Sequence, residues 1–139
     1  MLPNQPQRLD PNNHPETASP PIDLDALFEQ CMDDASIVGL VLDKLALQLA
    51  SDLVRVDDSF RNFETDSIRR TAHALKGAAG AAGAALLESS AHAVELRARE
   101  GTLDAASDEL NRLKQELLRC IDYVQTARDL AAMRGKKSR

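Results

Sequence analysis

The sequence predicts an all-α protein, an antiparallel up-down four-helix bundle with a short N-terminal cap helix. Three observations lead to this prediction. Apolar residues recur at spacings of three and four along four long stretches, aromatic residues make up only 3% of the chain, and tryptophan is absent. Such spacings place side chains on one face of a helix, whereas β-sheets are enriched in aromatic residues. Four amphipathic helices joined by short connections bury their apolar faces against one another.

Both ends of the chain are expected to lie outside the bundle. Residues 1–21 contain all six prolines and show no apolar period, which predicts a disordered leader. His14 lies within this leader, where no scaffold would hold it for a structural or catalytic role. Residues 134–139 read RGKKSR and predict a basic, disordered tail. The bundle is therefore assigned to residues 22–133.

The first two predicted helices have clear start signals. Asp23 is a candidate N-cap for a short helix that ends near Asp33, and a long helix follows from Ser36 to about Asn62. The apolar positions of the short helix are Leu24, Leu27, Phe28 and Cys31. Those of the long helix are Val38, Leu42, Leu45, Leu49, Leu53, Val56, Phe60 and Phe63. We expect the long helix to be a core helix and the short one to cap the bundle.

Glycines mark the ends of the next two predicted helices. Asp66 can cap the third helix, which ends or bends at Gly83, and the fourth closes at Gly101. The last helix starts at Thr102 or Asp104 and runs to about Ala132. The apolar faces of these helices are, in order, Ile68, Ala72, Leu75, Ala79 and Ala82; Leu87, Ala91, Val94 and Ala98; and Leu103, Ala106, Leu110, Leu113, Leu117, Cys120, Val124 and Ala127.

Composition argues against several classes of function. The formal net charge is −5, which disfavours a surface that tracks nucleic-acid phosphates. No apolar run approaches the length of a membrane span, and the N-terminus lacks a signal-peptide pattern, so we expect a cytoplasmic protein. Cys31 and Cys120 fall at apolar positions without metal-ligand spacing and are expected to be reduced core residues. His92 lies off the apolar face of its helix and is expected to be a surface residue.

The third helix carries the most informative residues. At about 100° per residue, His73 projects roughly 140° from the centre of the buried face, so its imidazole is expected in solvent. Lys76 lies on the flank. Helical side chains lean toward the N-terminus, so the residue that would cover His73 is at position 77, and that residue is glycine. Gly77 and Gly80 each cost the helix about 1 kcal/mol of stability relative to alanine. An exposed histidine that these glycines leave uncovered, with a lysine nearby, indicates a reactive site.

These residue types fit phosphoryl chemistry better than hydrolysis. An imidazole can attack an electrophilic phosphorus, and Lys76 with Arg69 or Arg70 can supply charged donors to phosphoryl oxygens. A hydrolase would need an orienting carboxylate and an oxyanion hole, and no such arrangement is legible in the sequence. The glycines at 77, 80 and 83 fit neither dinucleotide-binding nor P-loop spacing. The sequence therefore predicts a protein that handles phosphate without binding ATP.

Residues 72–79 (AHALKGAA), followed by Gly83 and Ala84, resemble the signature of histidine-containing phosphotransfer (HPt) domains. These domains relay phosphoryl groups in multistep two-component signalling. The resemblance continues downstream at Leu87, Ala91, Val94, Glu95 and Arg99, and it covers roughly residues 23–132.

The resemblance implies a phosphotransfer intermediate rather than an enzyme with its own turnover. His73 would accept a phosphoryl group from a receiver-domain aspartyl phosphate and pass it to another receiver aspartate. Lys76 would steady the phosphoryl oxygens, Gly77 would leave room for the receiver, and Gly80 would extend that clearance. Arg69 and Arg70 are further candidates for phosphoryl contact.

The resemblance also implies the partners, which are receiver domains of hybrid histidine kinases and of response regulators. They would dock on a patch of the second and third bundle helices around His73. The receiver would supply Mg²⁺, whereas this chain would hold no cofactor of its own. No nucleic acid or membrane partner is expected, and the protein is expected to be a monomer.

Two alternatives remain open at the level of the sequence. The chain could be a fragment carrying the phosphoacceptor domain of a chemotaxis-type histidine kinase, which shares the HxxKG pattern, or a helical-bundle interaction module without phosphoryl chemistry.

Glu95 and Arg99 form an i,i+4 pair in the favourable order, and we expect this pair to stabilise its helix rather than to contact phosphate.

Overall fold

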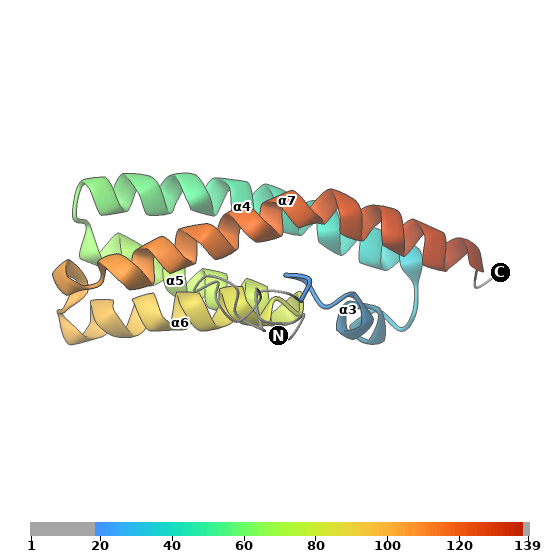
Figure 1. Cartoon of the computed structure of the whole chain (residues 1–139), viewed down its shortest axis with the longest axis horizontal. Helices are drawn as coiled ribbons and strands as arrows, with labels where there is room; N and C mark the ends of the chain where they lie inside the picture. The colour runs from blue at the N-terminus through green and yellow to red at the C-terminus, as the bar shows by residue number, and fades with distance from the viewer. Residues whose placement is uncertain (1–18, 138–139) are drawn as a thin grey trace, which may run out of the picture.

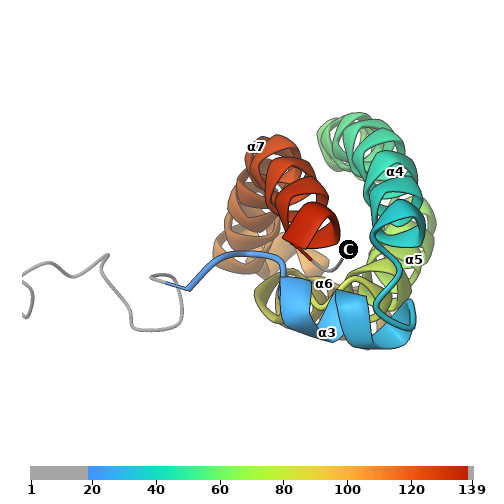
Figure 2. The same cartoon turned by 90° about the vertical axis from the view of Figure 1, so that its right-hand side faces the viewer.

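A computed structural model describes residues 19–137 and contains an up-down bundle of four long helices with a short helix across one end (Figures 1 and 2). The helices are α3 (Leu24–Gln30), α4 (Ala35–Arg61), α5 (Thr65–Ala81), α6 (Ala85–Glu100) and α7 (Ser107–Lys137), with the 3-10 helix η1 (Leu103–Ala105) before α7. The predicted fold class is therefore confirmed. Residues 1–18 of the predicted leader, including His14, and residues 138–139 of the predicted tail lie outside the described part.

The start of each of the first two helices is held by a side-chain cap. Asp23 accepts a hydrogen bond from Ala26 N and caps α3, as predicted, and Asp34 accepts from Ser36 N and Ile37 N to cap α4. Such caps satisfy backbone N–H groups that have no partner within the helix. The prediction that Phe63 continues the buried face of α4 is wrong. The helix ends at Arg61, and Phe63 has φ +55° and is 58% exposed.

The prediction that Asp66 caps α5 is also wrong. The helix begins at Thr65, two residues before the start that a cap at Asp66 would give, and its N-cap residue Glu64 makes no side-chain cap hydrogen bond. Asp66 lies in the first turn, where its carboxylate pairs with Arg69 at 3.4 Å and Arg70 at 3.5 Å. An acidic side chain in the first turn interacts favourably with the positive end of the helix dipole, so Asp66 supports the helix start without capping it.

Gly83 ends α5 and also fits α3 to the bundle. Its φ of +69° is a conformation that residues with a Cβ rarely adopt, and a Cβ there would lie 3.0 Å from Asp23 O. The amide of Asp23 donates to Gly83 O at 2.8 Å. Gly101, with φ +73°, ends α6 in the same left-handed conformation. Both predicted glycine stops are confirmed.

The last helix differs from the prediction at both ends. The chain first forms η1, α7 then begins at Ser107, and it continues through Lys137 rather than ending near Ala132. Residues 134–137 are therefore helical, and their assignment to a disordered tail is wrong. Arg134 binds Asp25 of α3 at 2.7 Å and lies 4.1 Å from the centre of the Phe28 ring. These contacts attach the end of α7 to the cap helix, which explains why the helix does not stop earlier.

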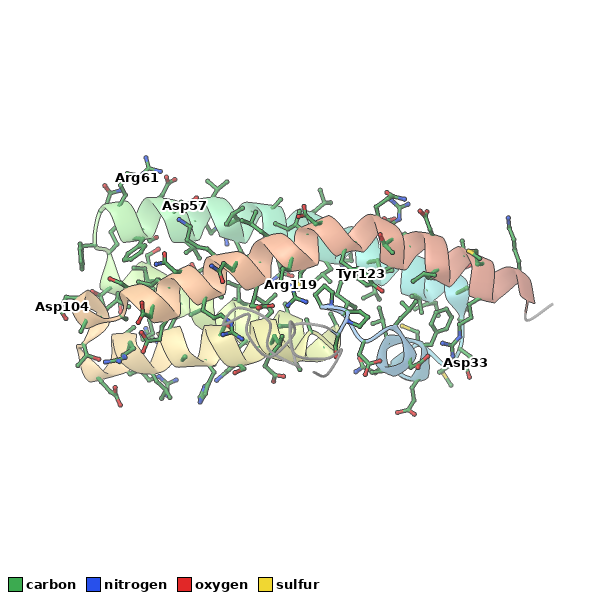
Figure 3. The ribbon with its side chains drawn as sticks, in the orientation of Figure 1. Asp33, Asp57, Arg61, Asp104, Arg119 and Tyr123 are labelled. Carbon is green, nitrogen blue, oxygen red and sulfur yellow. The ribbon has the colours of Figure 1, made fainter. Side chains whose placement is uncertain are left out.

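The core follows the predicted apolar faces closely. Cys31 and Cys120 are both buried and free, as predicted, and burial raises the pKa of the Cys120 thiol to about 11. The segment before α3 lies against α7, where Arg119 donates to Ser19 O at 3.0 Å; Figure 3 shows Arg119 and Tyr123 on that side of α7. Within residues 19–137, no helix combines the length and apolarity needed to cross a bilayer.

Candidate phosphoacceptor site

His73 lies on the exposed side of α5, as the helical geometry predicts. Its side chain is 62% exposed, yet one ring nitrogen has a partner on the neighbouring helix: Nδ1 lies 2.7 Å from Glu95 Oε2 of α6. The imidazole is therefore accessible to solvent and held in orientation at the same time.

Glu95 is the centre of the site. It is only 1% exposed, and three basic side chains converge on its carboxylate. Besides His73, Lys76 Nζ lies 2.9 Å from Oε1 and Arg99 Nη2 lies 2.9 Å from Oε2. Lys76 comes from α5 and Arg99 from α6, so the carboxylate joins the two helices beneath the imidazole.

The charge state of Glu95 determines the proton position on His73. Burial alone would raise the pKa of Glu95, but hydrogen bonds from Lys76 and His73 and the charges of Lys76 and Arg99 outweigh it and lower the pKa to about 2. An ionised carboxylate can only accept hydrogen bonds, so Nδ1 of His73 must carry the proton that it donates. In the neutral imidazole the lone pair is then on Nε2, which is the nitrogen free to react.

Sequence reasoning missed this role of Glu95. It predicted the pair with Arg99, which is present, but not the contacts to His73 and Lys76. A signal existed in the sequence: Glu95 directly follows Val94 of the apolar face, at the edge of that face, where a carboxylate must find partners when it is buried. Those partners are 19 and 22 positions earlier in the chain, on another helix, and helical periodicity does not pair residues across helices.

Arg69 and Arg70 are not brought to the imidazole by any contact in the described part of the chain. Both guanidinium groups pair with Asp66, one to two turns before His73. Lys76 and Arg99, by contrast, share a carboxylate with His73 and lie beside it. The cations that share a carboxylate with His73 are therefore Lys76 and Arg99.

The two glycines near His73 have different surroundings. A Cβ at position 77 would meet no atom within 4 Å, so Gly77 borders open space, as expected for a clearance beside the imidazole. A Cβ at position 80 would lie 2.9 Å from Oε2 of Glu88, a residue of α6. The space beside Gly80 is therefore taken by a side chain of this protein, which argues against the expectation that Gly80 extends the clearance for a partner.

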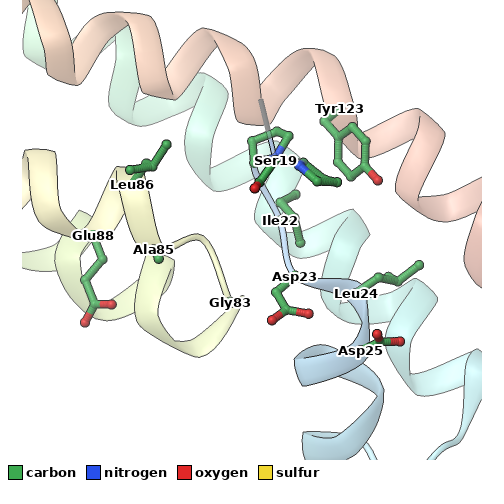
Figure 4. Close-up of a pocket in the computed structure, with 12 residues that line it drawn as sticks. Ser19, Ile22, Asp23, Leu24, Asp25, Gly83, Ala85, Leu86, Glu88 and Tyr123 are labelled. Atoms are coloured by element: carbon green, nitrogen blue, oxygen red, sulfur yellow. The ribbon is translucent and has the colours of Figure 1, made fainter. Parts of the chain in front are cut away.

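A separate cleft lies away from His73. It has a volume of about 650 Å³ and is formed by residues 19–25, the start of α6 and Tyr123 of α7 (Figure 4). None of His73, Lys76 and Glu95 lines it. Between residues 19 and 137, no three His, Cys, Asp or Glu side chains are grouped as a metal site would require.

The comparison with known families agrees with this geometry. The profile of the Hpt domain family matches residues 24–127, which include α3 to α6 and α7 as far as Ala127. The chain belongs to the Hpt domain family. Hpt domains are helical bundles that carry phosphoryl groups in two-component phosphorelays, so histidine phosphotransfer is the general function of this domain.

A solved structure has the same fold. The crystal structure of histidine-containing phosphotransfer protein B (HptB) from Pseudomonas aeruginosa PAO1 superposes with a TM-score of 0.71, over 80% of this chain and 96% of that one, at 22% sequence identity. Among curated protein sequences, none matches this Hpt domain significantly. The bundle is thus the Hpt fold, with α3 as its short N-terminal cap.

Proposed function

We propose that His73 is the phosphoacceptor of this Hpt domain, which takes a phosphoryl group from the aspartyl phosphate of one receiver domain and delivers it to the aspartate of another. The observation that carries this proposal is the contact between His73 and Glu95. A buried, ionised carboxylate binds Nδ1–H at 2.7 Å and leaves Nε2 of a largely exposed ring facing solvent.

The transfer step follows from this arrangement. The lone pair of Nε2 attacks the phosphorus of the receiver's aspartyl phosphate. A new N–P bond forms, the bond between phosphorus and the aspartyl oxygen breaks, and the electron pair leaves with the receiver's carboxylate. The imidazole keeps its proton on Nδ1 and gains positive charge, which Glu95 stabilises electrostatically. Transfer to the second receiver is the same step in reverse.

The neighbouring residues have supporting roles in this proposal. Lys76 and Arg99 already lie beside the ring and can contact the oxygens of the incoming phosphoryl group as charge-assisted donors. Gly77 leaves the approach to the imidazole open, because the space where a side chain at position 77 would lie is empty. Arg69 and Arg70 are bound to Asp66 and would act only after leaving that carboxylate.

In this proposal the protein is a carrier without an ATP site or turnover of its own. The receiver domain supplies Mg²⁺ and most of the catalytic groups, so this chain needs no cofactor of its own. The partners are receiver domains of hybrid histidine kinases and of response regulators, which dock transiently over α5 and α6 around His73. The protein acts as a cytoplasmic monomer.

The test is phosphoryl transfer from a receiver domain labelled with ³²P on its aspartate. The wild-type chain is expected to take up label that is lost in acid and retained in base, as is typical of a phosphoramidate. His73→Gln is expected to take up none. His14→Gln and His92→Gln, which change the other two histidines, should each retain the label.

Two outcomes would contradict the proposal. Label that persists in His73→Gln would place the phosphoacceptor at another residue. A wild-type chain that takes up no label from any of a panel of phosphorylated receivers would favour the alternative of an interaction module without phosphoryl chemistry.

A further inference from the structure

A shallow groove lies directly beside the proposed phosphoacceptor site. It has a volume of about 490 Å³ and is lined by Lys76, Ala85, Glu88, Ser89 and His92. Lys76 belongs to both the groove and the site, because its ammonium group also binds Glu95. Any partner that covers His73 closely therefore also covers part of this groove.

Glu88 gives the groove its unbalanced charge. Its side chain is exposed, and in the structure of residues 19–137 its carboxylate takes part in no hydrogen bond or ion pair. The charge of Lys76, by contrast, is already engaged by Glu95 at 2.9 Å. A cation entering the groove would thus meet an uncompensated carboxylate next to a hydroxyl, that of Ser89.

The Glu88 carboxylate lies against Gly80 of α5. The carboxylate rests over α5 at the position where position 80 lacks a side chain, and a Cβ there would come within 2.9 Å of Oε2. The carboxylate is therefore directed across α5, on the same side as Lys76. Glu88 and Ala85 also line the cleft of Figure 4, so the groove and the cleft share these two residues at the start of α6.

We propose that Glu88 determines receiver specificity by binding a lysine or arginine side chain of the receiver domain that docks on His73. This inference rests on the proposed function and adds a selection rule to it. Receivers with a basic side chain opposite the groove are bound, and receivers with an acidic one are repelled. An opposite charge across an interface raises the affinity for the correct partner, and a like charge lowers the affinity for an incorrect one. Glu88 does not touch the imidazole and takes no part in the transfer step.

The experiment measures transfer from the receiver that labels His73, as a function of receiver concentration. Glu88→Lys is expected to raise the half-saturating receiver concentration at least tenfold and Glu88→Gln about threefold, with the maximal rate unchanged within twofold. Gly80→Ala should give an increase of about twofold, because the new methyl group displaces the carboxylate. Each basic residue on the receiver's docking face is then changed to glutamate, and one of these changes should restore binding to Glu88→Lys.

The matched control is Asp104→Lys, which makes the same change in net charge. Asp104 lies in η1 at the end of the bundle remote from α3, and Figure 3 shows it there. This variant should bind the receiver like the wild type. Far-ultraviolet circular dichroism and thermal unfolding confirm that each variant is folded.

Three outcomes would overturn the inference. Glu88→Lys and Glu88→Gln could bind the receiver like the wild type, Asp104→Lys could weaken binding as much as Glu88→Lys, or the maximal rate could fall while the half-saturating concentration stays constant. In all three cases His73 would still be labelled, and the proposed function would stand. Loss of label from the wild type would instead contradict the proposed function itself.

Discussion

Two buried carboxylates in this bundle have opposite electrostatics. Glu95 of α6 is 1% exposed and binds three basic side chains, and its pKa is lowered to about 2. Asp52 of α4 is 2% exposed, and its pKa is raised, chiefly by burial. Its partners offset burial less well: Arg55, which is mostly exposed, lies 3.6 Å from Oδ1, and the side chain of Gln48 donates a hydrogen bond.

The difference between Glu95 and Asp52 shows what keeps a buried carboxylate ionised. Removing a carboxylate from water costs several kcal/mol, and only close, well-placed cations offset that cost. At Glu95 a cation from each of two helices, Lys76 and Arg99, and the N–H of the imidazole reach the carboxylate, so the ionised state is stable and can hold a proton on Nδ1. At Asp52 the single cation, Arg55, is mostly exposed and therefore screened by water. Burial alone therefore does not indicate a functional carboxylate, whereas convergence of partners from different helices does.

The largest expected effect is a loss of stability on acidification, which distinguishes Glu95 from Asp52 directly. Because the pKa of Glu95 is lower in the folded chain, its contribution to stability is complete above about pH 4.5 and is lost as the pH falls toward 2. The difference between 4.5 and about 2 corresponds to about 3 kcal/mol in the free energy of unfolding. Urea unfolding between pH 7 and pH 2 should show this loss in the wild type and not in Glu95→Gln.

Asp52 should behave in the opposite way in the same experiment. Its raised pKa means that its protonated form favours the folded state, so stability attributable to Asp52 decreases as the pH rises through its usual value of 3.8. Equal loss of stability in the wild type and Glu95→Gln between pH 4.5 and pH 2 would contradict the assigned charge state of Glu95.

Phosphoryl transfer is the second way to separate the two carboxylates. Glu95→Gln removes the charge that stabilises the positive imidazole, and we expect the maximal rate of transfer from a phosphorylated receiver to fall roughly 10- to 100-fold. The half-saturating receiver concentration should not change, because Glu95 is buried beneath the docking face. Asp52→Asn is the matched control and should transfer like the wild type. A rate in Glu95→Gln equal to that of the control would remove Glu95 from the mechanism.

The smallest expected effect concerns Asp52 alone. Asp52→Asn keeps the shape of the side chain and removes a poorly compensated buried charge, so the free energy of unfolding at pH 7 should rise by about 1 kcal/mol. The gain should vanish below about pH 4, where the carboxyl of the wild type is itself protonated. Chemical unfolding at the two pH values measures it. Destabilisation at pH 7 would mean that the Arg55 pair contributes more than burial costs.

Much of the fold and part of the site could be predicted from the sequence. Helical periodicity identified the buried faces, the exposure of His73 and the open space beside Gly77, because these depend on local geometry. Two errors, at Phe63 and Asp66, concern where α4 ends and α5 begins, and the others arose where one segment contacts another. The helical turns of α7 beyond Ala132 include Arg134, which binds Asp25 and Phe28, and the space beside Gly80 is filled by Glu88.

The sequence by itself determined the helices, the all-α class and an exposed histidine flanked by a lysine and a glycine, because helix geometry relates each residue to others within a turn or two. Only the tertiary structure decided that Glu95 lies beneath that histidine. The two residues are 22 positions apart, and they meet because α5 and α6 pack in one register that brings the edge of one apolar face against the exposed flank of the other. The proton on Nδ1, and with it the free Nε2, depends on that register.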